Sequence, residues 1–199
     1  DPENIIDHYG ADSVRLFILS DSPPEKDVQW SEEGIIASFK FIQKLWGLNN
    51  KIKEEIDKNH KKDINTELTK YTNKFIKKIS DNLENFHYNI MVANLHEMHS
   101  FINKEINKGY QKKTILENYK KILITINPII PHLSSECLKI IGSRDKFIWP
   151  NYDVKYLKEN SCLIVIQING KKRGLINTNS NVSEAEIMDL VSKNEKLMK

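Results

Sequence analysis

Residues 31–57 read SEEGIIASFKFIQKLWGLNNKIKEEID, and this stretch decides the fold class. Ser31 is a typical helix N-cap, and the two acids after it favour the positive end of the helix dipole. Apolar side chains then recur every three or four residues, which predicts a helix from about 32 to 57. The side that we expect to face a core consists of Ile35, Phe39, Ile42, Leu45, Trp46, Ile52 and Ile56.

The opposite side of this helix carries a narrow stripe of cations. The cations are Lys40, Lys44 and Lys51, and Gly47 lies within the same stripe. Such a stripe is typical of a solvated helix face. It also fits a track of ammonium groups for a phosphate backbone, which Gly47 would allow to approach closely.

Further helices are expected on the C-terminal side. Helical periodicity predicts them over 66–85, 89–107 and 111–126. Pro128 and Pro131 then interrupt the chain, and a short helix runs to Gly142. Because the connections are short, residues 32–142 predict an antiparallel helix bundle, and the chain as a whole is mainly α.

Two short helices are predicted ahead of the long one, over 3–8 and 11–20. Asp12 and Arg15 lie three residues apart on the second, a spacing at which an acid and a guanidinium meet, so we expect a structural pair. The chain starts on Asp1, a capping residue type, and stops within the helical pattern SKNEKLMK. We therefore expect it to be a fragment of a larger protein.

The pattern changes after the bundle. Residues 143–160 read as a linker, after which the apolar period shifts from 3.6 to about 2. CLIVIQI at 162–168 predicts a strand, Asn169-Gly170 a type I′ turn, and KKRGLI at 171–176 the return strand. These elements predict the start of a small, separate α/β domain with a β-hairpin.

A last helix over 184–198 is predicted by the capping box of Ser183 and Glu186. The first strand of the hairpin offers alternate isoleucines to bury against this helix, namely Ile164, Ile166 and Ile168.

The return strand of the hairpin begins with Lys171, Lys172 and Arg173. Strict alternation places Lys171 and Arg173 on one face and Lys172 on the other. Cations on an edge strand protect it against aggregation. Three cations beside a turn equally suit contact with a sugar-phosphate backbone. Gly174 would leave room for the backbone, and the Arg173 guanidinium can donate two hydrogen bonds to one phosphate.

The composition narrows the class of protein. The chain has 199 residues, a net charge of +3 and 39% hydrophobic residues, so a mild basic excess permits an anionic partner. Neither cysteine, Cys137 or Cys162, belongs to a CxxC pair, which favours free thiols in a reducing cytoplasm. No apolar run reaches the roughly 20 residues of a membrane span, and no signal peptide is visible.

Signs of catalysis are missing from the sequence. His96 and His99 lie three apart on a predicted helix, but no third metal ligand of suitable spacing accompanies them. No Gly-rich phosphate loop and no GxSxG motif occurs. We therefore expect neither a metal site nor a complete catalytic site in this chain.

Several motifs resemble class I aminoacyl-tRNA synthetases of the valine, isoleucine and leucine group. They are YGADSVRLF at 9–17, NPIIPHLSSEC at 127–137 and IWP at 148–150. Two others are more similar to the leucine enzyme of bacterial and organellar type. They are PPEKDVQWSEEGIIASFKFIQKLW at 23–46 and IVIQINGKKRGLI at 164–176.

The resemblance implies that the chain starts just after the KMSKS region. Residues 1–31 would be the stem-contact region, 32–150 the helical anticodon-binding-type bundle with its linker, and 151–199 the beginning of the C-terminal domain. The catalytic and editing domains would be absent. The tRNA-binding residues would be Lys40, Lys44, Lys51, Lys171, Lys172 and Arg173.

The resemblance also implies partners. The parent enzyme would use ATP and Mg²⁺ to activate leucine and charge tRNA(Leu), as a cytoplasmic monomer without membrane attachment, whereas this fragment would need no cofactor. The family often carries Arg where Lys44 and Gly47 stand here, and neither keeps the bidentate fork of an arginine. The alternatives are the matching fragment of the valine or isoleucine enzyme, and a helical adaptor that binds no RNA.

Overall fold

The structure is a computed structural model that describes residues 2–21, 23–58, 60–61, 63, 66–143, 147–158, 161–168, 171–179 and 182–192. The chain divides into two compact units, Asp1–Val154 and Lys155–Lys199. The predicted cap Asp1, the predicted turn Asn169-Gly170 and the predicted helical residues 193–198 lie outside the described residues.

The first unit begins with helices α1 (Pro2–Tyr9), α2 (Ala11–Asp21) and α3 (Glu32–Lys58). Gly10 has a φ of +79°, a left-handed conformation that suits glycine and lets the chain turn between α1 and α2. Ser31 caps α3 as predicted, because its hydroxyl accepts a hydrogen bond of 3.1 Å from the Gly34 N–H.

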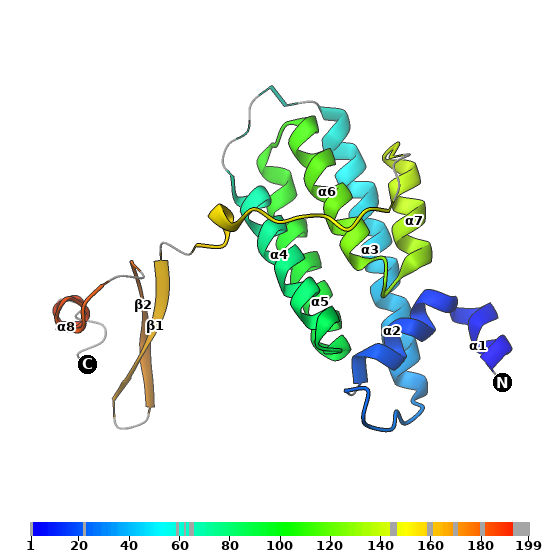
Figure 1. Ribbon diagram of the computed structural model, residues 1–199, viewed down its shortest axis with the longest axis horizontal. Coiled ribbons are helices and arrows are strands. Elements are labelled where there is room, and N and C mark those ends of the chain that lie inside the picture. The colour runs from blue at the N-terminus through cyan, green and yellow to red at the C-terminus, as the bar shows by residue number, and fades with distance from the viewer. Residues whose placement is uncertain are drawn as a thin grey trace. The chain divides into compact units, whose positions relative to one another are not determined.

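The bundle is completed by α4 (Glu67–Glu84), α5 (Tyr88–Glu105), the 3₁₀ turn η1 (Ile106–Lys108), α6 (Lys112–Ile126) and α7 (Pro131–Ile140). α4 packs against both α5 and α6, while α3 packs against α6 and α2. Figure 1 shows these long helices lying side by side along one direction. The predicted mainly α, antiparallel bundle is confirmed.

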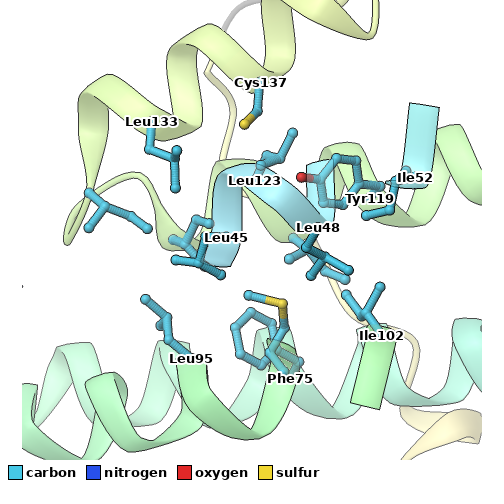
Figure 2. Close-up of a cluster of buried hydrophobic side chains, with 14 of the residues drawn as sticks. Leu45, Leu48, Ile52, Phe75, Leu95, Ile102, Tyr119, Leu123, Leu133 and Cys137 are labelled. Carbon is cyan, nitrogen blue, oxygen red and sulfur yellow. The ribbon is translucent and has the colours of Figure 1, made fainter. Parts of the chain in front are cut away.

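The core lies where the long helices meet (Figure 2). Each of five helices contributes side chains that are at most 8% exposed. They are Leu45, Leu48 and Ile52 of α3, Phe75 of α4, Leu95 and Ile102 of α5, Tyr119 and Leu123 of α6, and Leu133 and Cys137 of α7. Burial of this apolar surface is the main force that holds the helices together.

The buried face of α3 differs from the predicted face. Phe41 and Leu48 are each only 4% exposed, whereas Trp46 is 39% exposed. Phe39 is half-buried and packs edge-on against Tyr9 of α1, with ring centroids 5.7 Å apart. The reason is that α2 and α5 also pack against α3. They bury the side of the helix that carries Phe41, so the buried face is rotated from the predicted one.

Asp12 and Arg15 do not bond to each other, so the predicted pair is wrong. Both residues are structural, as predicted, but each has another partner. The Arg15 guanidinium donates from Nε to the Ile129 carbonyl at 3.1 Å and from Nη2 to the Pro128 carbonyl at 2.6 Å. The Asp12 carboxylate instead accepts backbone N–H groups at the start of α7. Both side chains therefore fasten α2 to the α6–α7 turn.

The segment predicted as a linker is held against α4 along part of its length. Trp149 Nε1 donates to Ser80 Oγ at 2.9 Å, and the Asp153 N–H donates to Asn73 Oδ1 at 2.7 Å. Figure 1 shows the yellow chain after α7 crossing the bundle toward α4. We call residues 147–153 the strap.

The second unit contains strands β1 (Ser161–Ile168) and β2 (Lys171–Asn179), which pair antiparallel, and helix α8 (Glu184–Ser192). The short 3₁₀ turn η2 (Val154–Tyr156) precedes them. The predicted capping box is confirmed, since the Ser183 N–H donates to Glu186 Oε2 at 2.8 Å. Hydrogen bonds from the Ser183 backbone and hydroxyl lower the pKa of Glu186.

Candidate nucleic-acid interface

The lysine stripe of α3 is exposed only in part. Lys40 and Lys44 are both exposed and lie one helical turn apart, about 6 Å along the axis. Lys51 is half-buried, and its ammonium group donates to the Asn103 carbonyl at 3.0 Å and to Asn103 Oδ1 at 2.9 Å. Lys51 therefore fastens the end of α5 to α3, which the sequence did not reveal.

Gly47 lies on open surface. A Cβ atom added there would meet no other atom within 4 Å, so packing does not require a glycine at this position. The absent side chain leaves the backbone of α3 accessible between Lys44 and Lys51, as the sequence predicted for a closely approaching chain.

Two histidines of α5, which sequence reasoning had set aside, lie next to this stripe. The His96 ring stacks on Phe41, with centroids 3.7 Å apart, and His99 lies edge-on to the same ring at 6.0 Å. The His99 ring also hydrogen-bonds to the backbone of Lys44. Only the three-residue spacing of the histidines could have placed them on a common face, because the contact with α3 is tertiary.

The cations of the hairpin are exposed as predicted, at Lys171, Lys172 and Arg173. Their arrangement departs from strict alternation, because Gln167 pairs with Lys172 and Ile166 pairs with Gly174. Arg173 is thus the extra residue of a β-bulge, and the strict alternation predicted for residues 171–173 does not hold in this pairing. Sequence periodicity does not reveal a bulge inside a strand.

The isoleucines of β1 support the hairpin. Ile164 and Ile166 are half-buried while Val165 and Gln167 between them are exposed, so β1 alternates as predicted. The Ile168 side chain lies outside the described set. α8 packs against β2.

The described residues contain no cluster of three or more His, Cys, Asp or Glu side chains that could hold a metal ion. In the described part of the chain, no single helix is both long enough and apolar enough to cross a membrane. What the described surface does offer is exposed cationic side chains on α3 and on the hairpin. Such groups bind anions.

The family described as the anticodon-binding domain of tRNA ligase matches residues 65–188, which is more than half of the chain. The chain belongs to this family. The match begins just before α4 and continues through the strap and the hairpin into α8, so it covers parts of both compact units.

Leucine–tRNA ligases are similar to the chain over nearly all of its length. The enzyme of Prochlorococcus marinus subsp. pastoris is 38% identical over 95% of this chain and 23% of its own length. That of Bartonella quintana is 36% identical over 96% of this chain, again 23% of its own length. The chain thus spans about a quarter of these relatives, and the resemblance to the leucine enzyme is confirmed.

A solved structure shares the fold. It is a chain in the crystal structure of the ternary complex of Agrobacterium radiobacter K84 agnB2 LeuRS, tRNA and LeuAMS. The TM-score is 0.80 at 18% sequence identity, over all of this chain and 27% of that chain. At this identity the likeness concerns the fold.

Proposed function

We propose that this chain is the tRNA-binding part of a leucine–tRNA ligase. The complete enzyme activates leucine with ATP and Mg²⁺ and attaches it to tRNA(Leu) in the cytoplasm, as a monomer. The observation that carries the proposal is the similarity to leucine–tRNA ligases from the first helix to the last. One such relative is 33% identical over the whole chain. The chain itself binds tRNA and performs no chemistry.

The bundle acts as a rigid support for the RNA backbone. Leu45 and Leu48 are buried on the inner side of α3, so packing fixes the helix from which Lys40 and Lys44 project. Two ammonium groups one turn apart neutralise phosphates and release bound counterions, which favours binding without reading sequence.

The hairpin is the second contact. The bulge at Arg173 interrupts the regular pairing of β2, and Arg173 is exposed there. A guanidinium offers two parallel donors to a phosphate, so Arg173 contributes more than either lysine.

The complete enzyme tests the proposal through Arg173→Ala. We expect a raised KM for tRNA(Leu), unchanged leucine-dependent ATP–pyrophosphate exchange, and partial recovery in Arg173→Lys. Lys158→Ala is the matched control, because Lys158 is exposed in the same unit but outside the hairpin. If Arg173→Ala charges tRNA like the wild type at every tRNA concentration, the hairpin cations merely protect an edge strand.

A further inference from the structure

His96 and His99 form a cluster with the lysine-bearing flank of α3. Phe41 is only 4% exposed, and it holds the stacked His96 ring and the edge-on His99 ring against α3. The hydrogen bond between His99 and the Lys44 backbone holds the second imidazole on α3, where the charge of Lys44 acts on it. The positions of these rings are therefore set by packing between two helices.

The charged groups that act on the two imidazoles are cations. Lys44 of α3 acts on both, Lys51 of α3 acts on His99, and His99 acts on His96. The cavity beside His96, toward α2 and the loop before α3, is lined by uncharged polar groups such as Ser20, Gln29 and Ser31. Among the described groups that shift the pKa of either histidine there is no carboxylate.

Protonation of these rings is therefore opposed within the free chain. Partial burial is the main cause that lowers the pKa of both His96 and His99, and the neighbouring cations add to it. The hydrogen bond to the Lys44 backbone offsets part of this effect at His99, whose pKa is still lowered. Both imidazoles are thus neutral at pH 7. A protonated His96 or His99 adds a positive charge near Lys44. No carboxylate is among the described groups that act on these histidines, so this charge is not neutralised.

We propose that His96 and His99 belong to the same phosphate-binding surface as Lys40 and Lys44, and that this surface binds RNA more tightly when both histidines are protonated. The inference rests on the proposed function. A phosphate brings to the cluster the negative charge that its surroundings lack, so RNA binding and proton uptake favour each other.

The free chain shows the opposite dependence on pH. The folded-state pKa of each histidine lies below the ordinary value of 6.5, so the unfolded chain takes up protons first. The neutral rings contribute their full stability above about pH 6.5, and this contribution is lost as the pH falls through the folded-state pKa. Acidification thus loosens the free chain while it tightens the complex.

The test measures the Kd of the full 199-residue chain for an unmodified tRNA(Leu) transcript at pH 7.5 and 5.5, at constant ionic strength. For the wild type we expect the Kd to fall about tenfold on acidification, as two exposed ion contacts are gained. The double variant His96→Gln/His99→Gln should lose this gain. His60→Gln/His87→Gln removes two exposed imidazoles elsewhere and should behave like the wild type.

A second variant keeps the inference testable if the double glutamine variant fails to fold. His96→Lys carries its charge at both pH values, so it should bind tRNA(Leu) more tightly than the wild type at pH 7.5 and gain less on acidification. A wild-type Kd that does not change with pH, or an equal fall in His96→Gln/His99→Gln, overturns the inference and leaves the proposed function standing. Failure to bind RNA at either pH removes the proposed function as well.

Discussion

Asp12 of α2 accepts a hydrogen bond of 2.7 Å from the backbone N–H of Leu133, although the two residues are 121 positions apart. The same carboxylate accepts the His132 N–H at 3.2 Å and lies 3.0 Å from His132 Nδ1. These N–H groups belong to the first turn of α7, where a helix leaves its donors without internal partners. Asp12 therefore caps α7 from another helix and joins the motif YGADSVRLF to the motif NPIIPHLSSEC.

Replacing Asp12 by alanine should destabilise the first unit by about 2 kcal/mol, because the donors at the start of α7 lose their acceptor in a buried place. Urea unfolding followed by circular dichroism measures the change. Asp7→Ala is the matched control, since Asp7 is exposed on α1 and should change the stability little. Equal stability of the two variants would show that the cap contributes nothing.

Phe86 closes α4 in an unusual way. Its φ is +57°, a left-handed conformation that glycine normally adopts at a helix end. Its side chain is 59% exposed, so little packing compensates for this conformation. Phe86→Gly should therefore raise the unfolding free energy by about 1 kcal/mol, which thermal unfolding measures. Phe86→Ala separates the effect of the ring, which lies edge-on to Tyr88 at 6.0 Å, from that of the backbone. A less stable glycine variant would mean that the ring contact outweighs the backbone strain.

Asn73 of α4 holds the strap at Asp153 and is itself fixed within α4. Its Oδ1 accepts the Asp153 N–H, and its Nδ2 donates to the Thr69 carbonyl. Asn73→Ala should speed hydrogen exchange at the Asp153 amide and expose the strap to proteases, while amides in α5 keep their protection. Ser80→Ala, which removes only the acceptor of Trp149, should have a smaller effect at Asp153. Unchanged exchange at Asp153 in Asn73→Ala would contradict this role.

Cys137 should be unreactive in the folded chain. Burial raises the pKa of its thiol to about 12, so almost no thiolate exists at pH 8. In the variant Cys162→Ser, a thiol reagent at pH 8 should label Cys137 only after denaturant unfolds the bundle. Labelling of the native variant at the rate of a free thiol would show that α7 opens readily.

The sequence predicts the helices well because their periodicity and caps are local. Ser31, Gly10 and the Ser183–Glu186 box each signal an element boundary through the backbone of a few neighbouring residues. The rotated core face of α3 was missed because Phe41 is buried by α2 and α5, which contact it from distant parts of the chain. Likewise, Asp12 and Arg15 have the spacing of a local pair but bind a turn more than 110 residues away.

The candidate interface was predicted only as a set of cations. Exposure of Lys40, Lys44 and the hairpin cations follows from amphipathic patterns. The sequence could not show that Lys51 is bonded to Asn103, that Arg173 occupies a bulge, or that His96 stacks on Phe41. Each of these facts depends on which helices or strands lie next to one another.

The salt dependence of tRNA(Leu) binding tests the central claim most directly. The wild-type chain should lose affinity linearly in a plot of log K against log salt, and Lys40→Ala/Lys44→Ala should lower the slope by about 1.5, as two phosphate contacts are removed. Lys53→Ala removes an exposed cation of α3 outside the stripe and should leave the slope unchanged. Equal slopes for the double variant and the wild type would contradict the account and return Lys40 and Lys44 to an ordinary solvated helix face.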